Sequence, residues 1–75
     1  MSLQMDKLQM LRELEGHNTL ETMFEKAFSD SVVPAICMEP GCDYHTEMEP
    51  DQSKGYCELC EKNTVQSCLV IAKIL

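Results

Sequence analysis

The spacing of apolar residues predicts two helices in the first 30 positions of the chain. The apolar side chains of the first segment fall into one half of a helical wheel; they are Leu3, Leu8, Met10, Leu11 and Leu14. Gly16 follows directly, as is typical of a helix end. In "NTLE", Asn18 is placed to cap a second helix and Glu21, three residues later, to complete a capping box. The apolar face of that helix consists of Leu20, Met23, Phe24, Ala27 and Phe28. Residues 3–30 therefore predict a helical hairpin with one apolar side.

From Val32 onward the chain changes to short β-prone pieces separated by turn residues. "VVPAIC" predicts a strand, which Pro34 confines to a sheet edge or to a strand start because proline lacks the N–H that a ladder needs. "YHTEM" alternates as a half-exposed strand does, and "EPDQSKG" predicts a turn before "YC" begins the return strand. The two cysteine pairs would then lie at the ends of one β-hairpin.

The last segment, "VQSCLVIAKIL", contains no turn residue, and Asn63 or Thr64 can cap a closing helix. Its apolar residues are Leu69, Val70, Ile71, Ile74 and Leu75, and their β-branching leaves a strand open as the alternative. We therefore predict one α+β domain over residues 1–75. It comprises an N-terminal helical hairpin (3–30), a zinc-ribbon-like module built on a β-hairpin (32–63) and a C-terminal apolar helix (64–75).

Length and location limit how such a domain is stabilised. A chain of 75 residues buries little apolar surface and usually needs a metal, disulfides or a partner chain. The apolar faces exceed what one short chain can cover, which predicts a homodimer. No secretory signal precedes the first helix, and the longest apolar run, residues 68–72, is too short to cross a bilayer. We expect a cytoplasmic protein without membrane contact, where paired cysteines bind metal or do redox chemistry more often than they form disulfides.

Charge argues against a nucleic-acid partner. Thirteen acidic and six basic side chains give a net charge of -7, and one Zn²⁺ held by four thiolates would bring it to -9. Such a field repels phosphate backbones, whose binding relies on lysine and arginine displacing counterions. Lys54, Lys62 and Lys73 are too few to form a basic patch.

Two close cysteine pairs give the chain its clearest candidate site. Cys37-x4-Cys42 and Cys57-x2-Cys60 are separated by 14 residues, the arrangement of a zinc ribbon. One loop offers two thiolates to an ion and a second loop completes the tetrahedron. Four residues between cysteines require a wide loop, which Pro40 and Gly41 can turn. The pattern predicts one structural Zn²⁺ held by these four cysteines.

Other interpretations of the cysteines stay open. His45 could replace Cys37 as a ligand, because Cys42-x2-His45 opposite Cys57-x2-Cys60 also provides a zinc ligand set, of three sulfurs and one nitrogen. Iron in a rubredoxin-like electron carrier, or a reversible dithiol, would make the protein a redox protein. Cys68 stands alone in an apolar segment and is expected to be a small buried side chain.

An enzyme is not expected. A set of four cysteines leaves a zinc ion no open position for a substrate. The sequence also lacks a serine nucleophile elbow, a phosphate-binding glycine loop and an H-E-x-x-H helix.

The order of motifs from residue 30 to residue 72 resembles that of a group of small uncharacterised bacterial and phage proteins with a zinc-ribbon-like module. The shared pattern is "DSVVP", a C-x4-C pair containing Pro-Gly, "EPDQ", a C-x2-C pair and "NTV" before an apolar tail. The resemblance implies that Cys37, Cys42, Cys57 and Cys60 are the ligands, and it argues against His45 and Cys68, where the resembling proteins carry other residues. We expect a small zinc-binding protein that acts as a protein-interaction or regulatory adaptor, with a partner protein that the sequence does not identify.

Overall fold

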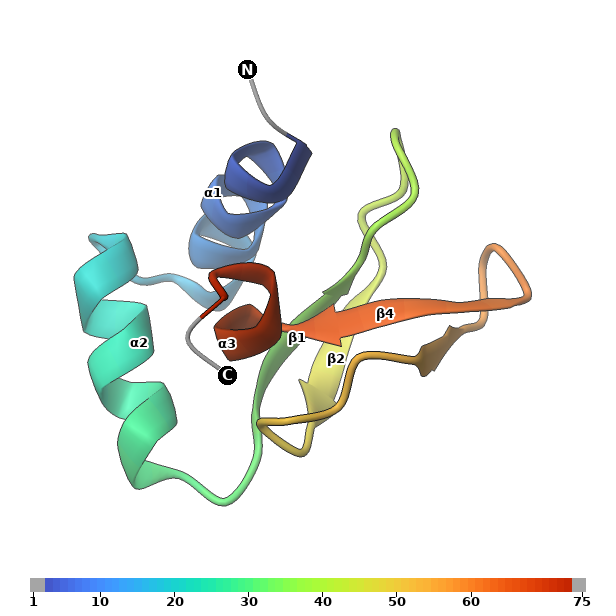
Figure 1. Cartoon of the computed structure of the whole chain (residues 1–75). Coiled ribbons are helices and arrows are strands. Elements are labelled where there is room, and N and C mark those ends of the chain that lie inside the picture. The colour runs from blue at the N-terminus through green and yellow to red at the C-terminus, as the bar shows by residue number, and fades with distance from the viewer. Residues whose placement is uncertain (1–2, 74–75) are drawn as a thin grey trace.

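A computed structural model describes residues 3–73 and contains helices and one antiparallel four-stranded sheet, which confirms the α+β prediction (Figure 1). The elements in chain order are α1 (Leu3–Glu15), α2 (Leu20–Ser29), β1 (Val33–Cys37), β2 (His45–Met48), β3 (Gly55–Cys57), β4 (Lys62–Ser67) and α3 (Cys68–Ile71). The three helices gather on one side of the molecule, while β3 and the far end of β4 extend away from them (Figure 1).

The predicted end of the first helix is confirmed, and the predicted cap of the second is wrong by one residue. The amides of Gly16 and His17 donate to the carbonyls of Glu13 and Arg12, the bond pair of a Schellman motif. The cap of α2 is Thr19, whose Oγ1 accepts from the Thr22 amide at 3.1 Å. Asn18 and threonine can both cap, but the β-branched Thr19 holds the extended backbone that a cap requires.

The sheet has the strand order β2-β1-β4-β3, with every neighbouring pair antiparallel. β1 is therefore an inner strand, so the expectation of an edge strand was wrong and the alternative of a strand start was right. Pro34 pairs with Glu47 of β2, whereas the pairing with β4 begins only at Ala35. Pro34, which has no N–H to donate, therefore lies outside the hydrogen-bond ladder between β1 and β4.

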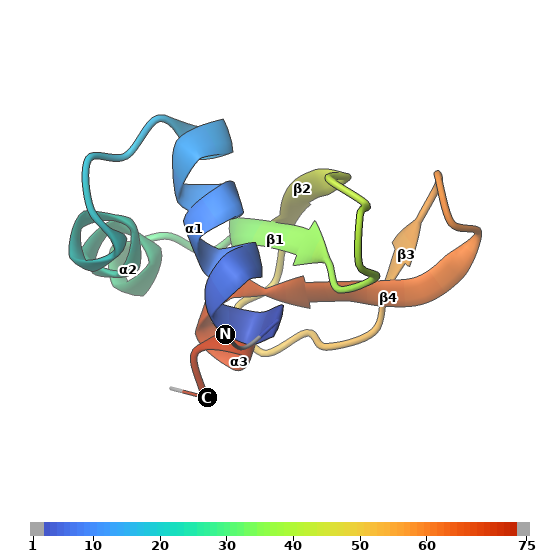
Figure 2. The same cartoon turned by 90° about the horizontal axis from the view of Figure 1, so that it is seen from above.

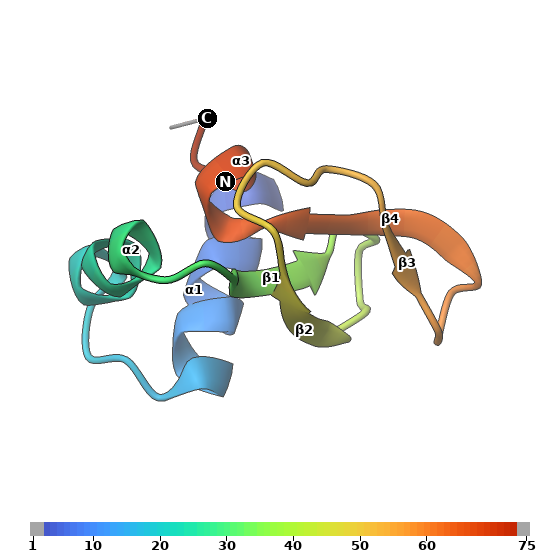
Figure 3. The ribbon, with the colours of Figure 1, turned by 90° about the horizontal axis from the view of Figure 1, so that it is seen from below.

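The predicted hairpin between "YHTEM" (44–48) and the return strand beginning with "YC" (56–57) does not form. β2 pairs with β1 and β3 pairs with β4, so β2 and β3 are the two edges of the sheet. The reason lies in β1, which is buried along its whole length and needs a hydrogen-bonded partner on both sides. The segment predicted to be a turn instead crosses from one edge to the other, and it is anchored where Ser67 donates its amide to Gln52 and its hydroxyl to Pro50 (Figure 3).

The predicted C-terminal helix is present but shorter than residues 64–75. The chain continues as β4 through Ser67, the strand alternative left open by the sequence, and α3 begins at Cys68. Ser67 caps it by accepting the Val70 amide at 3.2 Å. Ile74 and Leu75, counted in the predicted apolar face, lie outside the described residues. Within residues 3–73 no helix is long and apolar enough to span a bilayer.

Two groups of buried side chains hold these elements together. The larger group, the main core, lies between the helices and the sheet and consists of Leu8, Leu11, Met23, Ala27, Val33, Ile36, Cys68, Leu69 and Ile71. The smaller group, the small core, lies inside the curled sheet and consists of Ala35, Cys37, Cys57 and Val65. The sheet curls enough for Met48 of one edge to contact Gly55 of the other, and a Cβ at position 55 would collide with the Met48 methyl group.

Candidate metal centre

The first cysteine pair lies in the connection from β1 to β2, which we call the first knuckle (residues 37–42). Glu39, Pro40, Gly41 and Cys42 form a turn in which the Cys42 amide donates to the Glu39 carbonyl at 3.2 Å. Gly41 has φ of 82°, which a type II turn requires at its third position, and proline suits the second. This turn brings Cys42 back beside Cys37, as the Pro-Gly sequence predicts.

The second pair lies in the connection from β3 to β4, which we call the second knuckle (residues 57–60). The Cys60 amide donates to the Cys57 sulfur at 3.3 Å, and the Glu61 amide donates to the Cys57 carbonyl at 2.7 Å. Glu61 closes the turn with a left-handed φ of 56°, at the place where a glycine would meet no steric penalty.

Both knuckles lie at the same end of the sheet, away from α2, and they bring the four predicted cysteines together (Figure 2). The sulfur atoms of this thiol cluster (Cys37, Cys42, Cys57 and Cys60) all lie within 4.8 Å of one another. Two sulfur pairs cross between the knuckles: Cys37 to Cys60 and Cys42 to Cys57, each at 3.7 Å. All five cysteines of the chain are free thiols.

These distances fit a tetrahedral metal site. Metal–sulfur bonds of about 2.3 Å give a tetrahedron with sulfur–sulfur edges of about 3.8 Å. The two crossing pairs, at 3.7 Å, already have that spacing. Two of the sulfurs are buried and two half-buried, so an ion among them would be shielded from water. The thiol cluster can therefore hold one metal ion with all four coordination positions filled by the protein.

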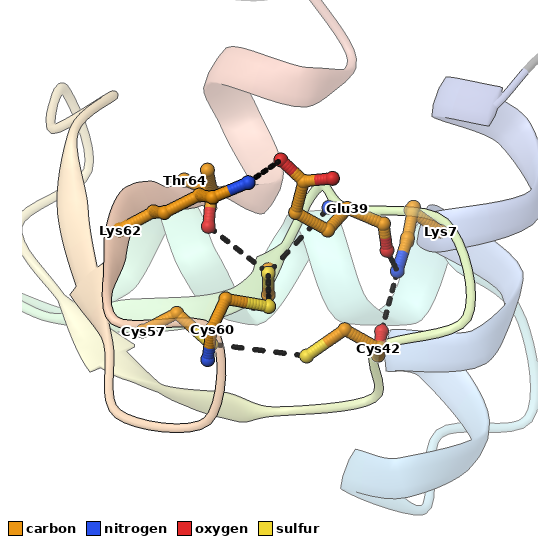
Figure 4. Close-up of polar contacts among 8 residues, drawn as sticks. Lys7, Glu39, Cys42, Cys57, Cys60, Lys62 and Thr64 are labelled. Atoms are coloured by element: carbon orange, nitrogen blue, oxygen red, sulfur yellow. Dashed lines mark hydrogen bonds and ion pairs between the residues drawn. The ribbon is translucent and has the colours of Figure 1, made fainter.

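Polar groups around Cys37 favour its ionised form over those of the other cluster cysteines. The sulfur of Cys37 lies 3.0 Å from the Thr64 hydroxyl and accepts the Glu39 amide at 3.5 Å (Figure 4). Burial raises the pKa of Cys37, but these hydrogen bonds and those of neighbouring thiols outweigh it and lower the pKa to about 7. Hydrogen bonding to Cys42, together with burial, raises the pKa of Cys60 to about 12. The metal-free cluster thus holds one thiolate readily, and the further thiolates need a cation to stabilise them.

The two other candidate residues lie elsewhere. His45 is exposed at the start of β2 with its Nδ1 3.3 Å from the Asp43 carbonyl, and it is not part of the group of ligand atoms that contains Cys37. The geometry therefore favours the four-sulfur set over the set with one histidine. Cys68 is fully buried among the helices, as expected, and burial raises its pKa to about 11.

Sequence reasoning missed two residues at the centre. Lys7 of α1 is buried and donates its ammonium to the Glu39 and Cys42 carbonyls of the first knuckle. The sequence did indicate that Lys7 lies on the apolar face of the helix, because it is four residues after Leu3 and four before Leu11. Thr64 had been considered only as a helix cap. On the outside, Lys62 reaches the Glu39 carboxylate at 3.7 Å from the side opposite Lys7 (Figure 4).

Comparisons with protein-family models, with curated proteins and with solved structures found no match. The resemblance to small bacterial and phage proteins therefore stays a prediction, and the functional argument rests on the thiol cluster itself.

Proposed function

We propose that this chain is a small zinc-binding protein in which one Zn²⁺, held by Cys37, Cys42, Cys57 and Cys60, joins the two knuckles and acts structurally. The observation that carries the proposal is the placement of four sulfurs within 4.8 Å of one another, with crossing pairs at tetrahedral spacing. A set of four sulfurs suits zinc and leaves it no open position, which supports a structural rather than a catalytic ion. Free thiols agree with a reducing compartment such as the cytoplasm.

Native mass spectrometry with metal analysis of freshly purified protein tests this proposal. One zinc per chain is expected, together with four thiols that react with an alkylating reagent only after chelation. The same four sulfurs would also hold iron, so stoichiometric iron would move the assignment to a rubredoxin-like redox protein. Protein that takes up neither metal under reducing conditions would contradict a metal centre.

We further propose that the metal-stabilised fold serves as a protein-interaction or regulatory adaptor. Leu59 at the tip of the second knuckle is 68% exposed, and Phe28 at the end of α2 is 63% exposed. Large apolar side chains held on fixed turns and helix ends are suited to anchor a partner protein. The net charge of -7 favours partners with basic surfaces over nucleic acids.

The exposed apolar residues also support the proposal of a homodimer. Phe28, Leu14 and Met5 leave apolar surface on the two long helices. Sedimentation velocity over a range of micromolar concentrations measures the mass directly. A dimer mass that falls to the monomer value in Phe28→Glu would locate the contact, whereas a concentration-independent monomer would contradict the homodimer.

A further inference from the structure

Lys7 is a buried cation whose two side-chain hydrogen bonds in residues 3–73 both go to the first knuckle. It is 2% exposed and lies on α1, a helix that contributes no cysteine. Its Nζ donates to the Glu39 carbonyl at 2.6 Å and to the Cys42 carbonyl. Within residues 3–73 the ion pairs involve other cations, so no carboxylate there neutralises Lys7. A buried ammonium needs an opposite charge nearby to be stable.

A loaded thiol cluster would supply that charge. Four thiolates around a divalent ion carry a net charge of -2, whereas the four cysteines without an ion carry at most the single negative charge of one thiolate. Cys42 belongs to the cluster and also accepts the Lys7 hydrogen bond through its carbonyl, which places the ammonium beside the centre (Figure 4). Because this region is largely shielded from water, the attraction between the two charges is strong.

The residues next to Lys7 connect the same helix to the main core. Leu8 and Leu11 pack with Val33 and Ile36, and Met38 of the first knuckle packs against that group. The position of α1 on the sheet therefore depends on both an apolar contact and the Lys7 contact to the knuckle.

We propose that Lys7 couples metal binding to the docking of α1, so that the loaded thiol cluster holds the helix on the sheet and loss of the metal releases it. This inference rests on the proposed metal centre. Release exposes Leu8 and Leu11, which turns metal loading into control over an apolar surface that a partner protein can bind. Because coupling is reciprocal, docking of α1 must strengthen metal binding by the same factor by which the metal strengthens docking.

The test compares Lys7→Met, which keeps the apolar stem and removes the charge, with Lys7→Arg, which keeps the charge. Lys26→Met is the matched control, because Lys26 is an exposed lysine on α2 that pairs with Asp30 at the surface. Zinc affinity is measured by competition with a chromophoric chelator. We expect Lys7→Met to bind zinc about 10-fold to 100-fold more weakly, and Lys26→Met to differ less than about 3-fold from wild type. Lys7→Arg should retain most of the affinity.

Amide hydrogen exchange of the zinc-loaded proteins separates coupling from a general loss of stability. In Lys7→Met, α1 should exchange about 10-fold faster while the β1 and β4 amides keep their protection. Zinc affinity and α1 exchange equal to wild type would overturn the proposal, and so would equal acceleration in α1 and the sheet. If Lys7→Met does not fold, wild type decides: metal removal must accelerate α1 more than β1 and β4, and any other pattern overturns the coupling. Failure of wild type to bind zinc would instead overturn the metal centre itself.

Discussion

Replacing Cys57 by serine is the sharpest test of a structural metal, because this residue serves the cluster and the small core together. Cys57 is 0% exposed, its sulfur lies 3.7 Å from that of Cys42, and it accepts the Cys60 amide at 3.3 Å. A ligand that binds only the folded state stabilises it by about 4 kcal/mol when its free concentration is about 1,000 times the dissociation constant. For a domain of this size, about 1 kcal/mol shifts Tm by roughly 4–8 °C. Chelation should therefore lower the wild-type Tm by roughly 15–30 °C, and Cys57→Ser should lose that response.

Cys68→Ser is the matched control, because Cys68 is equally buried but lies in the main core away from the thiol cluster. A hydroxyl buried there costs about 1–3 kcal/mol, which lowers Tm by roughly 5–20 °C. Cys68→Ser should nevertheless keep one zinc and the full response to chelation. The two variants thus separate lost packing from lost coordination.

Thermal melts followed by circular dichroism, with and without a chelator, give both quantities, and metal analysis gives the zinc content. The reasoning is refuted if Cys57→Ser keeps a cooperative melt at the wild-type temperature with one bound zinc. It is equally refuted if the wild-type melt does not respond to chelation although zinc has been removed.

The surroundings of the cluster lead to four further predictions. Thr64→Val removes the hydroxyl 3.0 Å from the Cys37 sulfur, so the pKa of Cys37 should rise above its value of about 7. A thiolate absorbance titration of the metal-free protein measures this pKa, and an unchanged pKa would contradict the role of the hydroxyl. Zinc must displace thiol protons, so its affinity should increase with pH, with about four protons released below the Cys37 pKa and about three above it. Chelator competition measures the slope of log zinc affinity against pH, and a slope that stays constant through pH 7 would speak against a depressed Cys37 pKa. The depressed pKa of Cys37 also stabilises the metal-free fold above pH 9, the ordinary thiol value, and this contribution should be lost as pH falls through about 7. Glu61→Gly relieves a left-handed backbone at φ 56° and should leave Tm unchanged or raise it by a few degrees, whereas a clear fall in Tm would exclude strain at that position.

The sequence was sufficient where local chemistry determines structure. The two long helices follow from apolar spacing and from a glycine stop, because these act within a few residues. The first knuckle follows from Pro40 and Gly41, whose backbone preferences agree with the turn that they form. The spacing of the cysteines was enough to name the four residues that the fold brings together.

The sequence was insufficient where distant segments compete for the same partner. "YHTEM" and the segment beginning with "YC" looked like consecutive strands of one hairpin, and short-range pairing is the usual outcome for neighbours. The fully buried β1 instead takes β2 and β4 as partners, and its pairing with β4 joins distant residues such as Ala35 and Ser67. Lys7 escaped prediction for the same reason, since its partners lie 32 and 35 residues away.

The composition of the small core explains why a metal suits this fold. The core inside the curled sheet has four buried members, and two of them, Cys37 and Cys57, belong to the thiol cluster. Ala35 and Val65 alone bury too little apolar surface to hold two hairpins together. An ion bound by two sulfurs from each knuckle would join the β1–β2 hairpin to the β3–β4 hairpin, and its binding energy would become folding energy. Metal loss should therefore loosen the two knuckles and release α1 through the first of them, while β1 and β4 stay paired with each other and β1 stays packed against the main core.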